Sequence, residues 1–259
     1  MTNSEGISFE MVLKETASLP FVRVNRDSFL KTELAKYCPE HQVKKAIGST
    51  PACAGIEPAL IHTIAKSCIS YETNKVSALS FAAGIPGGLA IFGTIPADLA
   101  QYFGHIFRVV QKLIYLYGWQ ELFDSENNMD DETANLLTLF VGVMFGVSGA
   151  AAAITKIAES MAMKTSKDLA RKALTQGIIY PIVKKVAAVL GQKMTKDIFA
   201  KGVSKIIPIV GGVLSGGLTY ITFRPMSCRL QEYLSQLKLV DPSYCDEEKI
   251  EDDKSMWPV

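Results

Sequence analysis

Three long stretches without a single charged residue limit most strongly what this chain can fold into. They cover residues 76–97, 133–155 and 206–223. Each approaches the ~20 residues that a helix needs to cross a bilayer, so each must be buried in protein or in lipid. The middle stretch carries nine strongly apolar residues, which favour insertion by only about 3–5 kcal/mol before its polar residues and glycines are subtracted. Prolines interrupt the first and third stretches. The sequence favours a buried core and leaves membrane insertion open.

Small residues recur four positions apart inside each uncharged stretch. This spacing places them on one side of a helix, where a neighbouring backbone can approach closely. The pattern therefore predicts tight helix-on-helix packing, either in a buried helical hairpin or in lipid. The glycines concerned are Gly84, Gly88, Gly142, Gly146, Gly212 and Gly216.

The rest of the chain shows helical rather than strand periodicity. Amphipathic patterns predict helices over residues 7–20, 26–38, 57–73, 96–119, 158–179 and 181–200. We expect an all-α fold: a single helical domain with Gly-rich apolar core helices and no substantial sheet. Residues 1–56 form its helical N-terminal extension, residues 57–238 the main helical domain, and residues 239–259 an acidic disordered tail.

The formal net charge of +1 hides a strongly basic segment. Residues 164–205 contain ten Lys or Arg against two Asp. These cations either form the solvated face of surface helices or meet an anionic membrane, where each contributes about 1 kcal/mol. The near-zero overall charge argues against a nucleic-acid binder. The lysines expected at the membrane surface are Lys184, Lys185, Lys193, Lys196 and Lys201.

A small polar patch is the one candidate for chemistry. Asp98 belongs to the first turn of the helix predicted after Pro96, His105 lies two turns further on, and Arg108 follows. This patch is either a functional site or ordinary helix surface with a capping acid. Cys38 and His41 have metal-like spacing, but no second pair stands at a matching distance, so no metal is expected. No motif of a known enzyme class is present, and no cofactor is expected.

Five cysteines are too few and too widely spaced for a disulfide framework in 259 residues. They favour a reducing compartment. The first residues show no basic segment followed by an apolar run, so no cleavable signal peptide is expected.

Two blocks of the sequence resemble the EcsC protein family. In residues 82–119 a glycine-rich apolar segment leads into Pro-Ala-Asp-Leu and then a helix with an aliphatic-aromatic run ending in Tyr-Gly. Residues 206–234 are similar to the family's second landmark, a Pro-x-Val-Gly-rich segment followed by a basic amphipathic helix. The resemblance implies an all-helical bacterial protein of largely unassigned activity, often encoded near membrane transport systems. It supplies no catalytic residues.

Together these features predict a non-enzymatic, membrane-associated helical protein at the cytoplasmic side. Its partner would be an anionic membrane surface or a membrane protein, homo-oligomers are compatible with the sequence, and nucleic acid is not expected. One alternative is a pore-forming or membrane-disrupting effector whose apolar helices insert. The other is a lipid or small-molecule enzyme that uses Asp98, His105 and Arg108.

Overall fold

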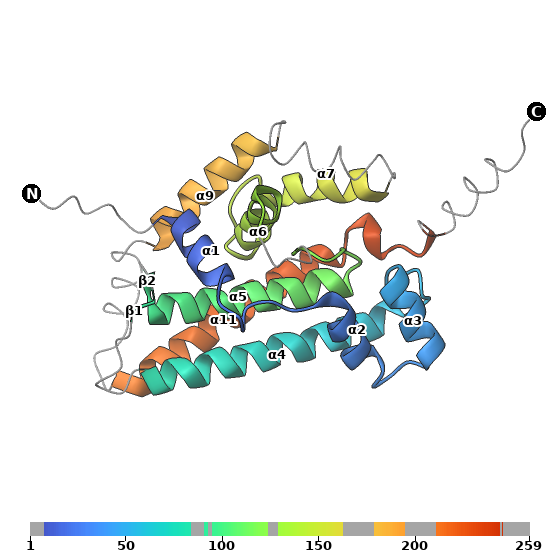
Figure 1. Ribbon diagram of the computed structural model, residues 1–259, viewed down its shortest axis with the longest axis horizontal. Helices are drawn as coiled ribbons and strands as arrows, with labels where there is room; N and C mark the ends of the chain where they lie inside the picture. Colours follow the sequence, from blue (N-terminus) through green and yellow to red (C-terminus); the bar gives the residue numbers. More distant parts are fainter. Residues whose placement is uncertain are drawn as a thin grey trace, which may run out of the picture.

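Three long helices lie side by side along the length of the molecule: α4 (Pro58–Ala83), α5 (Ala97–Leu116) and α11 (Gly211–Leu234) (Figure 1). This computed structural model describes residues 8–83, 91–92, 95–123, 129–162, 179–194, 211–243 and 245. Gln231 near the end of α11 donates to His62 near the start of α4, so these two helices run antiparallel.

Shorter helices cover the three long ones. A second layer, at the top of Figure 1, contains α6 (Asp131–Met144), α7 (Ala150–Ala162) and α9 (Tyr180–Met194), and α1 (Phe9–Ala17) joins α9 to α5. The other described elements are α2 (Arg26–Leu34), α3 (Glu40–Gly48), the 3-10 turn η1 (Lys238–Val240), β1 (Ile91–Phe92) and β2 (Ile95–Pro96). The two-residue antiparallel strands are the only sheet in the described part, which confirms the all-α prediction.

Local sequence signals explain where several helices begin. The side chains of Ser8, Asn25 and Asp130 each accept a hydrogen bond from the backbone N–H three residues later. Such caps satisfy one of the N–H groups that the first turn of a helix leaves without a partner. Aromatic contacts then join the layers, as in the edge-to-face pair of Trp119 and Phe140 at 4.9 Å.

The predicted helices match the structure in part. The helix expected after Pro96 is α5, whereas the one expected over 57–73 continues to Ala83 and α3 was not predicted. The N-terminal helices pack on the main domain through α1 and α2. Within the expected acidic tail, residues 239–243 and 245 are described, and Leu239 is buried.

The uncharged stretch 133–155 is two helices rather than one. The helix α6 ends at Met144, and the turn before α7 contains Gly146 and Gly149, both with positive φ. Gly146 therefore ends a helix and does not share a helical face with Gly142, contrary to the predicted packing role, because its φ of +65° belongs to the left-handed region. Gly84 and Gly88 lie outside the described residues, and Gly212 and Gly216 lie on α11.

Gly142 occupies a very tight contact between α6 and its neighbours. A Cβ atom at this position would lie 2.6 Å from Val186 Cγ1 of α9 and 2.9 Å from Ala150 Cβ of α7. These separations are shorter than van der Waals contact, so even one added carbon must displace a neighbouring helix.

Replacing Gly142 with Ala is expected to lower the free energy of unfolding by about 1–3 kcal/mol, since overpacking outweighs the usual benefit of Ala in a helix. Urea denaturation measures the change. Gly48→Ala is the matched control, because nothing lies within 4 Å of its Cβ position. A Gly142→Ala protein as stable as wild type would contradict the contact.

One pair of cysteines is joined, at odds with the expected reducing compartment. Cys53 and Cys245 form a disulfide with their Cα atoms 5.4 Å apart, while Cys38, Cys68 and Cys228 are free. The bridge ties the loop after α3 to the end of the described chain.

None of the helices in the described ranges combines the length and the apolar character needed to cross a membrane.

Candidate functional site

A buried carboxylate on α4 gathers two cationic side chains and a histidine from α5. Glu72 has no exposed surface. Its Oε2 lies 2.7 Å from His105 Nδ1, and its Oε1 accepts from Lys112 Nζ at 2.7 Å and from Arg108 Nε at 3.2 Å. His105, Arg108 and Lys112 follow one another at i, i+3 and i+7, the spacing that aligns side chains on one helix face.

Electrostatics keeps this carboxylate ionised. Burial alone would raise the pKa of Glu72, but the hydrogen bond from His105 and the charges of Lys112 and Arg108 outweigh it and lower the pKa to about 2. Both carboxylate oxygens are already bound, and a group with so low a pKa accepts a proton poorly. The cluster is therefore suited to holding α4 against α5 rather than to general base chemistry.

The segment between α1 and α2 closes over this cluster. Arg108 Nη1 donates to the main-chain oxygen of Phe21, and the Phe21 ring lies 6.1 Å from the His105 ring. Gly104 makes room for it, because a Cβ there would be 2.8 Å from the same ring. Gln111 fixes the segment further by donating to Val22 O and accepting from Val24 N, both at 2.9 Å.

The structure unites only part of the predicted polar patch. His105 and Arg108 do meet, but through Glu72, which sequence reasoning missed together with Lys112. Asp98 lies in the first turn of α5, and its side chain is outside what the structure describes. The sequence did contain a signal for this cluster. It was a single carboxylate in an apolar helix, together with a second helix that carries basic residues at i and i+3.

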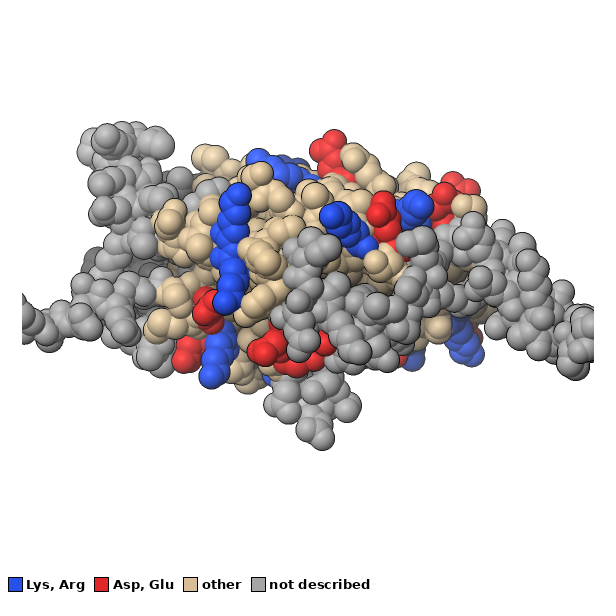
Figure 2. Space-filling view, turned by 90° about the horizontal axis from the view of Figure 1, so that it is seen from above, with Lys and Arg blue, Asp and Glu red and all other residues tan. Residues whose placement is uncertain are grey.

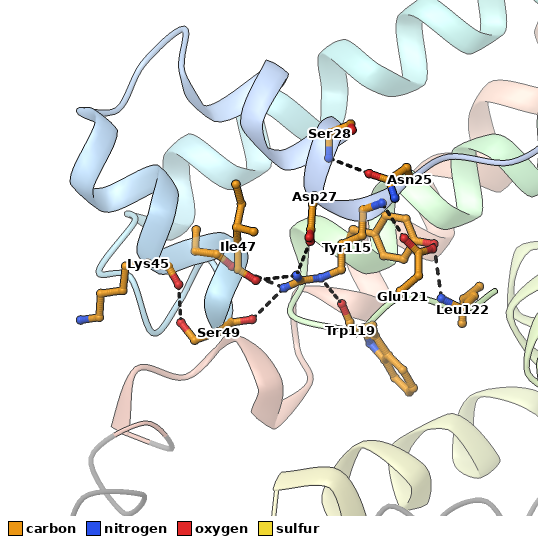
Figure 3. A network of polar contacts seen from close by, with 12 residues as sticks. Asn25, Asp27, Ser28, Lys45, Ile47, Ser49, Tyr115, Trp119, Glu121 and Leu122 are labelled. Atoms are coloured by element: carbon orange, nitrogen blue, oxygen red, sulfur yellow. Dashed lines mark hydrogen bonds and ion pairs between the residues drawn. The ribbon is translucent and has the colours of Figure 1, made fainter. Parts of the chain in front are cut away.

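A second buried polar network surrounds Arg26 and closes the end of α3 (Figure 3). The side chain is 4% exposed. Its Nη1 donates to Ile47 O at 2.8 Å, its Nη2 to Ser49 O at 2.7 Å, and its Nε to Trp119 O at 3.1 Å. The guanidinium thus satisfies carbonyls at a helix C-terminus and links α3 to the segment after α5. Burial lowers the pKa of Arg26, opposed chiefly by the neighbouring Asp27.

Replacing Arg26 with Lys is expected to cost about 2–3 kcal/mol of unfolding free energy, because one ammonium cannot reproduce the planar fork that reaches four carbonyls. Urea denaturation measures the loss. Arg224→Lys is the control, since Arg224 is exposed and its guanidinium donates to the hydroxyl of Tyr220. Equal stability of the two variants would show that the Arg26 network contributes nothing.

The predicted membrane lysines are described only in part. Lys184 and Lys185 lie exposed on α9, opposite its buried Val183 and Val186. The side chain of Lys193 and all of Lys196 and Lys201 are outside the described residues. On the face shown in Figure 2, described basic and acidic side chains alternate with broad uncharged surface between them.

Uncharged segments from α4 and α11 meet at one end of the molecule, at the lower left of Figure 1. Residues 76–83 of α4 and 211–223 of α11 contain no charge. The contact between His62 and Gln231 sets the antiparallel register, which brings Ala83 level with the start of α11. We call these two segments the uncharged end. At its edge Ile221 is 70% exposed.

Two exposed tyrosine–cation pairs stand where the uncharged end begins. On α4 the Lys75 ammonium lies 5.1 Å from the centre of the Tyr71 ring, and on α11 Arg224 Nη1 donates to the Tyr220 hydroxyl at 3.1 Å. Tyr71 and Tyr220 are both exposed. The antiparallel register places them at nearly the same level along the helix pair.

Comparison with known proteins gives no match, either among protein-family models, among curated proteins or among solved structures. The likeness to the EcsC family therefore rests on the sequence blocks 82–119 and 206–234.

Proposed function

We propose that this chain is a peripheral membrane protein that docks through its uncharged end. The observation that carries the proposal is that Tyr71 and Tyr220, each with its cation, lie at nearly the same level along the helix pair. This level is the boundary between the charged and the uncharged parts of the two helices. Tyrosines concentrate at membrane–water interfaces, with the ring at headgroup depth, and Lys and Arg favour the anionic headgroups there.

The dimensions support shallow docking. The eight uncharged residues of α4 span about 12 Å at 1.5 Å per residue. Interfacial helices bury their apolar faces roughly 5–10 Å deep, whereas the hydrocarbon core is about 30 Å thick. The uncharged end thus matches the headgroup and upper acyl region. Ile221, with most of its surface exposed, supplies apolar contact at its edge.

Other predictions from the sequence bear on this proposal. The EcsC likeness, with its association with membrane transport systems, is compatible with a membrane or membrane-protein partner and with a non-enzymatic role. We also propose that the apolar helices pack closely against one another at their small residues, and the tight contact at Gly142 supports this. The Cys53–Cys245 disulfide argues against the predicted location at the cytoplasmic side, because disulfides persist in oxidising compartments.

Vesicle flotation tests the docking surface. Ile221→Glu is compared with Tyr37→Glu, which changes an exposed apolar residue beyond α2, far from the uncharged end. We expect wild type and Tyr37→Glu to float with vesicles of phosphatidylcholine and phosphatidylglycerol, and Ile221→Glu to lose at least tenfold in partitioning. Equal flotation of both variants, or none of wild type, would contradict the proposal.

Two further arms of the same experiment separate the alternatives. Lys184 and Lys185 changed together to Gln should leave flotation nearly unchanged if docking is through the uncharged end, whereas a large loss would move the contact to α9. Dye release from the vesicles at saturating protein would favour the pore-forming alternative, and dye retention favours docking alone.

A further inference from the structure

A cavity of about 260 Å³ lies at the end of the helix pair opposite the uncharged end. Its walls come from the loop after α3, the first turns of α4, the last residues of α5 and the segment that follows α11. The turn η1 forms part of the wall. The Cys53–Cys245 disulfide holds it close to the loop after α3, where Cys53 adjoins the lining residue Ala52.

The lining is apolar and carries no charged side chain. Ile61, Leu116 and Leu239 are representative of the walls. An ionised ligand would lose its hydration here without gaining a counter-charge, so an uncharged molecule is favoured. A cavity of ~150 Å³ accommodates benzene, and by proportion this one holds roughly ten non-hydrogen atoms.

Of the polar side chains in the wall, His62 can donate a hydrogen bond into the cavity. Gln231 Nε2 donates to His62 Nδ1 at 3.1 Å and to His62 O, so a neutral His62 carries its proton on Nε2. The Tyr117 side chain is 3% exposed, and its hydroxyl makes no hydrogen bond of ordinary geometry to any described group. Burial raises the pKa of this phenol, and the nearby Gln231 amide opposes the rise. The Tyr117 oxygen is itself inaccessible, which leaves the His62 imidazole as the donor that a ligand in the cavity can meet.

We propose that this cavity binds a small uncharged molecule of bicyclic size that carries one hydrogen-bond acceptor. The apolar walls enclose its rings, and His62 Nε2 donates to the acceptor. This site is separate from the docking surface, so the inference holds whether or not the protein binds membranes.

Coumarin, an uncharged bicyclic lactone, is a suitable probe. Calorimetric titration of the oxidised 259-residue chain should give one site with a dissociation constant on the order of 10–100 µM. The charged 2-naphthoate should bind at least tenfold more weakly. Failure of wild type to bind coumarin would overturn the proposal.

Matched variants locate the site. Ala52→Leu projects bulk from the loop into the cavity and should weaken coumarin binding at least tenfold. Ala59→Leu makes the same change at an exposed position of α4 outside the lining and should bind as wild type does. Equal binding by the two variants would place coumarin elsewhere and overturn the assignment.

His62→Phe tests the donor. It should weaken coumarin several-fold while leaving naphthalene, which has no acceptor, unchanged. The same small effect on both probes would show that His62 is not the donor.

Discussion

Glu72→Gln is expected to lower the free energy of unfolding by about 3–5 kcal/mol, the usual cost of breaking a buried ion cluster by removing one partner. The substitution preserves shape but removes the single negative charge that faces His105, Arg108 and Lys112. These three partners are buried or partly buried, so water cannot replace the lost carboxylate.

Glu33→Gln is the matched control for that measurement. Glu33 pairs with Lys36 at 2.7 Å, but the Lys36 side chain is half exposed. Exposed pairs contribute at most about 1 kcal/mol. Urea denaturation of both variants at neutral pH measures the two losses of unfolding free energy. If Glu72→Gln loses no more than Glu33→Gln, the Glu72 cluster does not stabilise the fold as proposed.

Acid titration gives a second readout of the same carboxylate. The pKa of Glu72 is about 2 in the folded chain, below its usual 4.5, so its contribution is fully present above pH 4.5 and disappears as the pH falls to about 2. The shift corresponds to about 3 kcal/mol. Wild type should therefore lose that much more stability than Glu72→Gln between pH 5 and 2, and parallel profiles would show that the carboxylate is not stabilised.

Removing the Cys53–Cys245 disulfide is expected to cost about 3–5 kcal/mol of unfolding free energy. The two cysteines are 192 positions apart in a chain of 259 residues, so the bridge closes most of the chain into a loop and restricts the unfolded state strongly. Cys53→Ser should lose this contribution, and Cys38→Ser, which alters a free thiol, should not.

Treatment with a reductant distinguishes the effect of losing the disulfide from the effect of replacing a cysteine side chain. Dithiothreitol should destabilise wild type to the level of Cys53→Ser and leave Cys53→Ser unchanged. Stability that does not respond to dithiothreitol in wild type would mean that the disulfide is absent or contributes nothing.

Helical periodicity predicted most of the described elements because their apolar faces repeat at 3.6 residues. The long helix after Pro96 is the clearest case, since Phe103, Ile106 and Val110 all face the core. The break inside 133–155 could not be read from hydropathy. It depends on Gly146 and Gly149 adopting positive φ, while glycine is equally compatible with a packed helix interface.

The candidate site was harder to predict because its central residue comes from another helix. His105 and Arg108 lie on one face of α5, and their spacing was visible in the sequence. Glu72 precedes His105 by 33 residues, and only the packing of α4 on α5 brings the two together. The pairing of Cys53 with Cys245 is likewise a consequence of tertiary structure.

Lipid quenching tests the docking of the uncharged end most directly. In a Trp257→Phe background, which leaves only the buried Trp119, a tryptophan is introduced by Ile221→Trp or, at the far end, by Tyr37→Trp. Both proteins are mixed with vesicles that contain lipids brominated near the headgroup. We predict strong quenching of Ile221→Trp and none of Tyr37→Trp beyond the Trp257→Phe background. Equal quenching of the two, or quenching of Tyr37→Trp alone, would contradict docking through this end.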